Sequence, residues 1–456
     1  MNKKNVIWIF GDQHRGQALG INGDPNIYTP NIDNLARLGV NFKNAVSGFP
    51  LCCPFRGSLL TSKYPHKCVP GHEYPLDTNH KTIAHAFNDQ GYHTAYFGKW
   101  HLDGFEEFNM RLKDCNDKIH DGRAAMHIVP PERRGGFKRW IGYDNNNSPW
   151  DTWVHGGDGD ETRSFKLDGY ETDVLSDMLI DYLKEKQEDG ESFFAVLSVQ
   201  PPHNPYVAPA KFQKNYTPGR IKLRGNVPNI KNVQEKARED LAGYYAQIEN
   251  LDYNLGRIRE ALNEFGLTDD THIVFFSDHG DMHGSHGQYL KMSPMQESIS
   301  IPFIIGGELA RYNGRLNGDC HVPINHVDIA PTTLGLCGLD VPDWMEGTDY
   351  AHYRIKGRRI DEEPDSAYLQ SVIPTGHHNS VDRPWRGIVT KDGWKYICFK
   401  RTPWLMFNLN EDPYEQVNLA HNSKFIEKRI ELNDRLQQWI TDTEDSFDLP
   451  ELTKEV

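Results

Sequence analysis

The chain opens with Val6-Ile7-Trp8-Ile9-Phe10-Gly11-Asp12-Gln13, a short apolar run that stops at two polar residues. Its β-branched and aromatic composition predicts a buried strand over residues 6–10. Similar runs recur further along the chain, and we expect each to form a strand of the same sheet. They cover residues 93–97, 193–199, 271–276 and 301–305.

The stretches between these runs have helical apolar spacing, most clearly at residues 82–90, 173–186 and 241–265. Alternating strands and helices predict an α/β fold whose mostly parallel sheet is covered by helices on both faces. In such sheets, ligands bind outside the carboxyl ends of the strands. We therefore expect the polar residues that follow four of the runs to meet at one site. They are Asp12, Gln13, Lys99, His101, His203, Asp278 and His279.

Two motifs suggest what this site does. The first is Leu51-Cys52-Cys53-Pro54-Phe55-Arg56, which has the form C-x-P-x-R. The second is Gly91-Tyr92-His93-Thr94-Ala95-Tyr96-Phe97-Gly98-Lys99-Trp100-His101, of the form G-Y-x-T-x-x-x-G-K-x-H. Together they resemble the two signatures of type I sulfatases, a family of the alkaline phosphatase superfamily. Without this pattern, Cys52 would be interpreted as a small buried apolar residue or as half of a Cys52–Cys53 redox pair.

The resemblance implies the alkaline-phosphatase-like fold, a mixed and mostly parallel sheet sandwiched by helices, with a smaller C-terminal α+β subdomain. It extends to about residue 439, because residues 405–420 resemble the C-terminal subdomain of sulfatases. We expect a catalytic domain at residues 1–365 and the subdomain at residues 366–456. In the subdomain the sequence predicts antiparallel strands and a closing helix. The strands are residues 367–372, 385–390, 394–399 and 405–408, and the helix is residues 424–441.

The resemblance also implies that Cys52 is oxidised to formylglycine after translation. The aldehyde hydrate offers one hydroxyl that attacks sulfur and a second that later expels sulfate, so one difficult step is divided into two. Arg56 is implied to orient the attacking hydroxyl and the metal ligands.

Four further residues match catalytic positions of the family. Lys99, His203 and Lys291 are implied to neutralise the sulfate oxygens. His203, with Lys291, is implied to protonate the leaving alcohol. His101 is implied to remove the proton from the second hydroxyl.

Asp12, Gln13, Asp278 and His279 match the family's metal-ligand positions. Carboxylate and amide oxygens are hard ligands that suit Ca²⁺ or Mg²⁺, and the imidazole leaves Mn²⁺ open. Without the resemblance, Gln13 would be interpreted as a surface amide at the start of a loop. Each aspartate would then be a candidate helix cap.

Residues 104–168 are rich in Gly, Asn, Asp, Arg and Trp and predict irregular excursions over the rim of the site. Three tryptophans and three arginines there either bind a sulfated saccharide or pack the excursion itself. They are Trp140, Trp150, Trp153, Arg133, Arg134 and Arg139. Other candidate substrate contacts at the rim are His72, His283, His377, His378 and Arg383.

The sequence leaves three hypotheses for function. The first is a sulfatase that removes sulfate from a sulfated carbohydrate, an oligosaccharide derived from an acidic polysaccharide. The second is a phosphonate or phosphate ester hydrolase with the same site, because the Asp12-Gln13 pair also resembles phosphonate monoester hydrolases. The third is a sugar-binding protein with an unmodified cysteine, which the full set of catalytic residue types disfavours.

The composition of this 456-residue chain disfavours several classes of binding partner. A formal net charge of −14 disfavours nucleic acid, and the absence of an apolar run of about 20 residues predicts no membrane span. Seven cysteines, sparse and odd in number, do not indicate a disulfide framework. We expect a cytoplasmic protein as the sequence is written, and a periplasmic or secreted one if a leader was removed. The modification of Cys52 implies a maturation enzyme as a partner.

Overall fold

The computed structural model describes residues 3–104, 127–307, 318–358, 363–376 and 381–452. Its core is a ten-stranded mixed sheet in the order β10-β2-β9-β8-β1-β7-β3-β4-β5-β6. The strands are β1 (Asn5–Gly11), β2 (Val40–Val46), β3 (His93–Lys99), β4 (Arg139–Tyr143), β5 (Trp153–Asp158), β6 (Ser164–Lys166), β7 (Phe193–Val199), β8 (Thr271–Ser277), β9 (Phe303–Gly306) and β10 (Gly318–Asn325).

The five strands predicted from apolar runs lie next to one another in this sheet. β1 pairs in parallel with both β7 and β8, and β7 pairs in parallel with β3. β9 runs antiparallel between β8 and β2. The expected α/β fold with a mixed, mostly parallel sheet is therefore confirmed.

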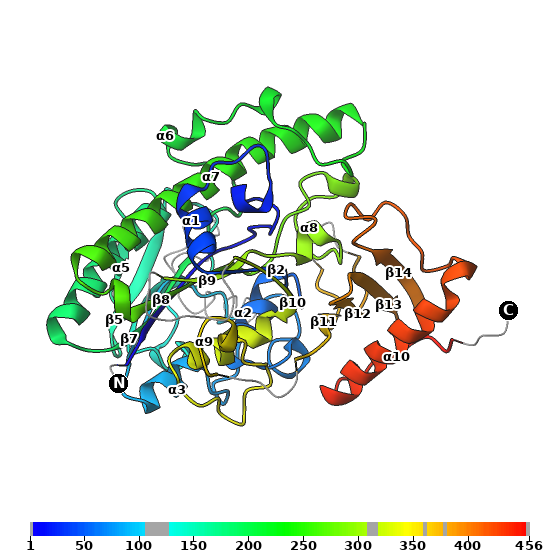
Figure 1. The fold of residues 1–456 in the computed structure, drawn as a ribbon. Helices are drawn as coiled ribbons and strands as arrows, with labels where there is room; N and C mark the ends of the chain where they lie inside the picture. The colour runs from blue at the N-terminus through cyan, green and yellow to red at the C-terminus, as the bar shows by residue number, and fades with distance from the viewer. Residues whose placement is uncertain (1–2, 105–126, 308–317, 359–362, 377–380, 453–456) are drawn as a thin grey trace.

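Helices cover both faces of the sheet because alternate residues of the strands point to opposite sides. Ile7 and Ile9 belong to one buried cluster with side chains of α1, α5 and α7. Trp8 belongs to a second cluster with side chains of α2, α3 and α9. Figure 1 shows these two sets of helices on opposite sides of the sheet.

The helices of the main body are α1 (Pro30–Leu38), α2 (Cys52–Thr61), α3 (Ile83–Asp89), α5 (Glu171–Asp189), α6 (Ala210–Gln213), α7 (Lys231–Glu264), α8 (Gln296–Ile299) and α9 (Ile329–Leu336). Full burial of each large apolar side chain against the sheet contributes about 1.5–3 kcal/mol. In the described part of the chain, no helix combines the length and the apolar character needed to cross a membrane.

Residues 127–168 differ from the expected irregular excursion, because three strands in this segment extend the sheet. β4 continues the sheet from β3 in parallel, and β5 and β6 follow antiparallel. Trp140 is fully buried in β4 and stacks on Tyr96 of β3, with ring centroids 6.4 Å apart. These three strands end the sheet at β6, and their glycines and polar residues weaken the apolar pattern by which the sequence indicated the central strands.

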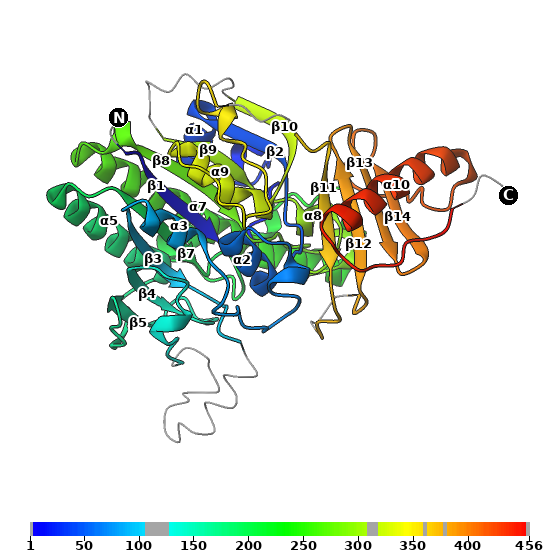
Figure 2. The ribbon, with the colours of Figure 1, turned by 90° about the horizontal axis from the view of Figure 1, so that it is seen from below.

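A separate four-stranded antiparallel sheet follows, in the order β11-β12-β13-β14. Its strands are β11 (Ser366–Ser371), β12 (Trp385–Thr390), β13 (Trp394–Phe399) and β14 (Thr402–Asn408), and α10 (Ile426–Asp442) closes the chain. Figure 2 shows this sheet beside the main body with α10 lying across it. The expected C-terminal antiparallel sheet and helix are confirmed, and the domain boundary at residue 365 stays a prediction.

The two faces of the small sheet have different partners. Tyr396 and Met406 face α10, where they pack with Leu432 and Leu436. The other face packs on the end of β2 and on α8 of the main body. The small sheet therefore lies between the main body and α10.

A buried ion pair also ties the small sheet to the main body. Lys395 of β13 is 0% exposed and pairs with Glu415, while its Nζ donates to the carbonyl of Pro294 at 2.5 Å. Glu415 in turn accepts from the backbone N of Gln296 at 2.7 Å. Burial lowers the pKa of Lys395 and raises that of Glu415, and each partner opposes the shift of the other.

Replacing Lys395 by Ala should destabilise the protein by about 3–5 kcal/mol, because buried Glu415 would lose the cation that compensates its charge. Urea unfolding followed by circular dichroism measures this loss. Lys400→Ala is the matched control: its exposed side chain pairs with exposed Asp448, so the change should stay within about 0.5 kcal/mol. Equal losses in the two variants would contradict the prediction.

Candidate active site

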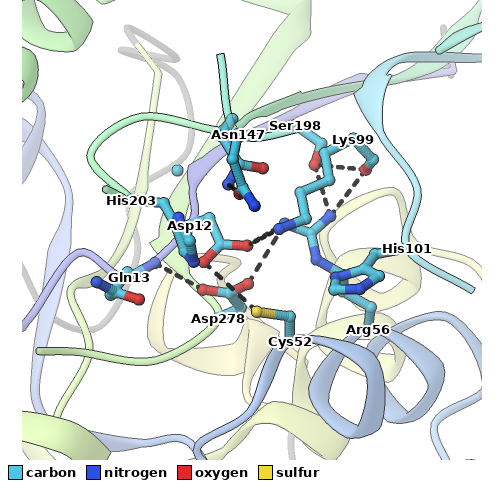
Figure 3. Close-up of polar contacts among 12 residues, drawn as sticks. Asp12, Gln13, Cys52, Arg56, Lys99, His101, Asn147, Ser198, His203 and Asp278 are labelled. Carbon is cyan, nitrogen blue, oxygen red and sulfur yellow. Dashed lines mark hydrogen bonds and ion pairs between the residues drawn. The ribbon is translucent and has the colours of Figure 1, made fainter. Parts of the chain in front are cut away.

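The polar residues at the strand ends come together because neighbouring parallel strands stop at the same edge of the sheet. Gly11 of β1 lies beside Ser277 of β8, so Asp12 and Asp278 leave the sheet side by side. The backbone N of Gln13 donates to Oδ1 of Asp278 at 2.9 Å. Figure 3 shows these residues facing Cys52 and Arg56, which α2 contributes.

Cys52 is the first residue of α2, a helix whose ten residues are all buried. Its Sγ lies 3.2 Å from Nε2 of His279, 3.3 Å from Nζ of Lys291 and 3.5 Å from Oδ1 of Asp12. Burial and Asp12 oppose ionisation of the thiol, but Lys291, Lys99 and His279 outweigh them. The pKa of Cys52 is therefore lowered well below its ordinary value.

Arg56 lies one helical turn after Cys52, so it projects from the same face of α2. Its guanidinium contacts both buried carboxylates, at 3.4 Å from Asp12 and 3.3 Å from Asp278. It also donates to the carbonyl of Lys99 and to Oγ of Ser198, both at 2.8 Å. Arg56 thus ties α2 to the ends of four strands.

Three side chains offer ligand atoms for a divalent cation beside Cys52. The ligand atoms of Asp12, Asp278, His279 and Cys52 all lie within 4.8 Å of one another, and all four residues are buried. Nδ1 of His279 donates to the carbonyl of Gly280 at 3.0 Å, which leaves Nε2 as the ligand atom. Burial and Asp12 raise the pKa of Asp278 to about 6. A cation between the carboxylates would remove this penalty, so the donor set fits a hard metal.

Gln13, the fourth predicted ligand, is held by its amide nitrogen. Nε2 donates to Oδ2 of Asp281 at 2.6 Å, and Tyr206 donates to the same oxygen at 2.6 Å. The amide oxygen of Gln13 accepts from Nζ of Lys291 at 3.1 Å. Asp281 therefore fixes which end of the amide is available to a ligand.

Lys291 and His203 form a hydrogen-bonded pair in which Lys291 holds the proton. Nδ1 of His203 donates to the carbonyl of Asn204 at 2.7 Å, so Nε2 accepts from Nζ of Lys291 at 3.0 Å. Burial and the charge of Lys291 hold the pKa of His203 well below its ordinary value. A second lysine, Lys99, donates from Nζ to Oδ2 of Asp12 at 2.6 Å.

The sequence analysis did not identify three residues that support this site. Ser198 donates to the carbonyl of Lys99 at 2.9 Å, and a serine in the otherwise apolar β7 was the signal for it. Asn147, which Figure 3 labels with the site residues, accepts from Nε2 of Gln200 at 3.1 Å. Glu73 pairs with His101 at 2.9 Å; the sequence placed residues 71–74 among the rim candidates but did not indicate this contact.

The candidate rim residues lie in different surroundings. His72 is half-buried, with Nε2 3.3 Å from Oε1 of Glu73. The guanidinium of Arg383 lies over the ring of Phe399, 4.7 Å from its centroid. His377 and His378 lie outside the described residues.

His283 does not lie at the rim. It is 1% exposed and packs against the rings of Tyr206 and Tyr244, with centroids 5.1 and 4.3 Å away. Burial lowers its pKa to about 4. Its Nε2 lies 3.5 Å from Asp281, so it belongs to the packing beneath Gln13.

Most of the candidate saccharide-binding residues at 133–153 pack within the protein. Arg139 pairs with Asp158 and with Glu185, both at 2.7 Å. Arg134 is buried and lies over the ring of Trp140. Trp150 differs from them because it is 48% exposed.

Comparisons with known proteins agree with this geometry. The sulfatase family model matches residues 4–339, and the model for the C-terminal part of N-sulphoglucosamine sulphohydrolase matches residues 284–442. An ulvan-active sulfatase from Formosa agariphila is 34% identical over 98% of this chain and 82% of its own length. An endo-4-O-sulfatase from Bacteroides thetaiotaomicron is 30% identical over 93% of this chain and 90% of its own. The yidJ crystal structure from Bacteroides fragilis superposes with a TM-score of 0.84, at 26% identity, over 98% of this chain and 97% of that one.

Asp278→Ala should weaken the binding of a divalent cation by about 10²-fold or more, because the variant loses a ligand that is also buried beside Asp12. Titration calorimetry with Ca²⁺, after chelation of the purified protein, measures the affinity. Asp269→Ala, at an exposed position before β8, is the control and should bind as the wild type does. Unchanged affinity in Asp278→Ala would contradict this assignment.

Proposed function

The chain belongs to the sulfatase family, and on this premise we propose that it removes sulfate from a sulfated carbohydrate with a formylglycine at position 52. The observation that carries the proposal is the set of groups around Cys52. Lys291, His279 and Asp12 all lie within 3.5 Å of its sulfur, at the carboxyl edge of the sheet. A maturation enzyme that oxidises Cys52 is the proposed partner.

The modified residue and the cation would supply the chemistry that no ordinary side chain has. Formylglycine, as its hydrate, supplies a nucleophilic hydroxyl and a second hydroxyl whose deprotonation releases sulfate. Asp12, Gln13, Asp278 and His279 would hold the cation, for which we propose Ca²⁺ with Mg²⁺ or Mn²⁺ as alternatives. It would supply positive charge next to position 52.

The side chains of this protein would bind the sulfate group and move its protons. Lys99 and Lys291 place two ammonium groups near position 52, where they would neutralise charge that grows on the sulfate oxygens. The Lys291–His203 pair would donate a proton to the leaving alcohol, since an alkoxide is a poor leaving group. Arg56 would keep Asp12 and Asp278 in place throughout.

A sulfated oligosaccharide is the proposed substrate class. The Formosa agariphila relative is an ulvan-active sulfatase, and the Bacteroides thetaiotaomicron relative is an endo-4-O-sulfatase. Trp150 offers an exposed ring of the kind that stacks on a sugar. Such contacts would supply binding energy from parts of the substrate remote from the sulfur.

Replacing Cys52 by Ala should lower activity on the order of 10⁴-fold or more, because the nucleophile is lost. Cys53→Ala is the matched control, since only Cys52 has Pro at +2 and Arg at +4. Burial keeps the Cys53 thiol neutral by raising its pKa, and its variant should retain activity within about tenfold. Peptide mass spectrometry should find the aldehyde on residue 52. An aldehyde on residue 53 would refute the assignment.

Among defined substrates, a sulfated oligosaccharide should exceed a simple aryl sulfate in kcat/KM by about 10²-fold or more. The experiment measures free sulfate released from a panel of sulfated oligosaccharides and an aryl sulfate. A phosphonate monoester in the same panel tests the alternative function. Faster turnover of the phosphonate would overturn the proposed function and favour the alternative.

A further inference from the structure

Glu73 and His101 form a buried hydrogen-bonded pair beside residue 52. Nε2 of His101 lies 2.9 Å from Oε1 of Glu73, and the two side chains are 4% and 17% exposed. The sulfur atoms of Cys52 and Cys53 interact with the same imidazole. One histidine thus connects a carboxylate to the position of the nucleophile.

The backbone conformation of both residues is unusual. Glu73 has φ 57° and His101 has φ 56°, the left-handed region that residues with a Cβ rarely occupy. Each such residue costs on the order of 1–3 kcal/mol, and the surrounding structure must maintain it. The two partners come from separate loops, so two strained turns are needed to bring them together.

Glu73 determines which nitrogen of His101 keeps its proton when the other nitrogen exchanges one. Burial opposes protonation of His101, but Cys53 and Glu73 raise its pKa well above the ordinary value. Burial opposes ionisation of Glu73, but His101 and His72 lower its pKa to about 2, so it is a carboxylate that only accepts hydrogen bonds. Nε2 of His101 must therefore donate. Nδ1 makes no hydrogen bond with any residue that the structure describes, so it is the ring nitrogen left to exchange a proton with residue 52.

We propose that Glu73 is a positioning residue that holds one ring proton of His101 on Nε2 and leaves Nδ1 as the nitrogen that exchanges a proton with residue 52. This inference rests on the proposed function. A proton that leaves a hydroxyl of residue 52 passes to Nδ1, and the ring proton on Nε2 remains in its bond to Glu73. His72, whose Nε2 lies 3.3 Å from Oε1 of Glu73, helps to hold the carboxylate in position.

Glu73→Gln is the sharpest test because the amide has nearly the shape of the carboxylate but can donate to Nε2. Long-range proton–nitrogen NMR of ¹⁵N-histidine-labelled protein with unmodified Cys52 reports the tautomer, and His101→Gln assigns the signal. The spectra are recorded above the pKa of His101, where the ring carries a single proton. The wild-type ring should then be protonated on Nε2, and the Glu73→Gln ring should shift toward protonation on Nδ1. A wild-type ring protonated on Nδ1 would overturn the inference.

The kinetics of the mature enzyme test the consequence. If His101 acts after the alcohol has left, Glu73→Gln should lower kcat by about 10²-fold and leave kcat/KM within about threefold. Glu73→Asp, which restores the acceptor, should recover kcat to within about tenfold of the wild type. Equal losses in kcat and kcat/KM, or no rescue by Asp, would overturn the inference.

The controls separate this inference from folding and from the proposed function. Glu444→Gln changes an exposed glutamate that pairs with Lys67 and should leave both measurements unchanged. Thermal unfolding should give the same midpoint for Glu73→Gln and the wild type. Failure of the proposed function would show instead as activity that survives Cys52→Ala. The tautomer measurement on the unmodified chain does not depend on that result.

Discussion

The arrangement of the site depends on the balance between two buried carboxylates and the cations around them. Asp12 and Asp278 are 0% exposed and leave adjacent parallel strands side by side, so burial and the charge of Asp12 oppose ionisation of Asp278. Arg56 contacts both, and it can do so only if α2 packs with its first turn against the sheet edge. Taking these charges out of water costs several kcal/mol per ion, which close pairing must offset. The position of Cys52 is therefore a consequence of how the carboxylates are neutralised.

The positive charge at the site is local, since the chain as a whole carries a formal charge of −14. Lys99 is the last residue of β3, and Lys291 lies in a loop almost two hundred residues later. Both come within reach of Asp12 and Cys52 because parallel strands end together. The backbone of the site is also strained, because Gln13 has φ 71° and the two neighbours of Lys291 have positive φ. A rigid ten-stranded sheet can maintain such turns at its edge.

The fold and the polar strand ends could be predicted from the sequence, because each depends on local patterns. Residues 6–10 and their counterparts are apolar runs bounded by polar residues, and the helical stretches between them predict a mostly parallel sheet. Partners across the site could not be predicted in this way. Glu73 lies 28 residues before His101 in an irregular loop, and no periodicity connects them. His283 shows the reverse error, since a polar residue in a Gly-rich turn was expected at the rim and is packed between tyrosines.

Burial of the whole of α2 also has a kinetic consequence. Every residue from Cys52 to Thr61 is buried, and Arg56 is held by four partners from remote parts of the chain. Once these contacts have formed, a maturation enzyme cannot reach the side chain of Cys52 or bind Pro54 and Arg56 beside it. Under the proposed function, oxidation of Cys52 would therefore have to precede the closure of α2 on the sheet, and chains that fold first would remain thiols. The modified fraction would then depend on the rate of folding, so slower closure of α2 would increase it.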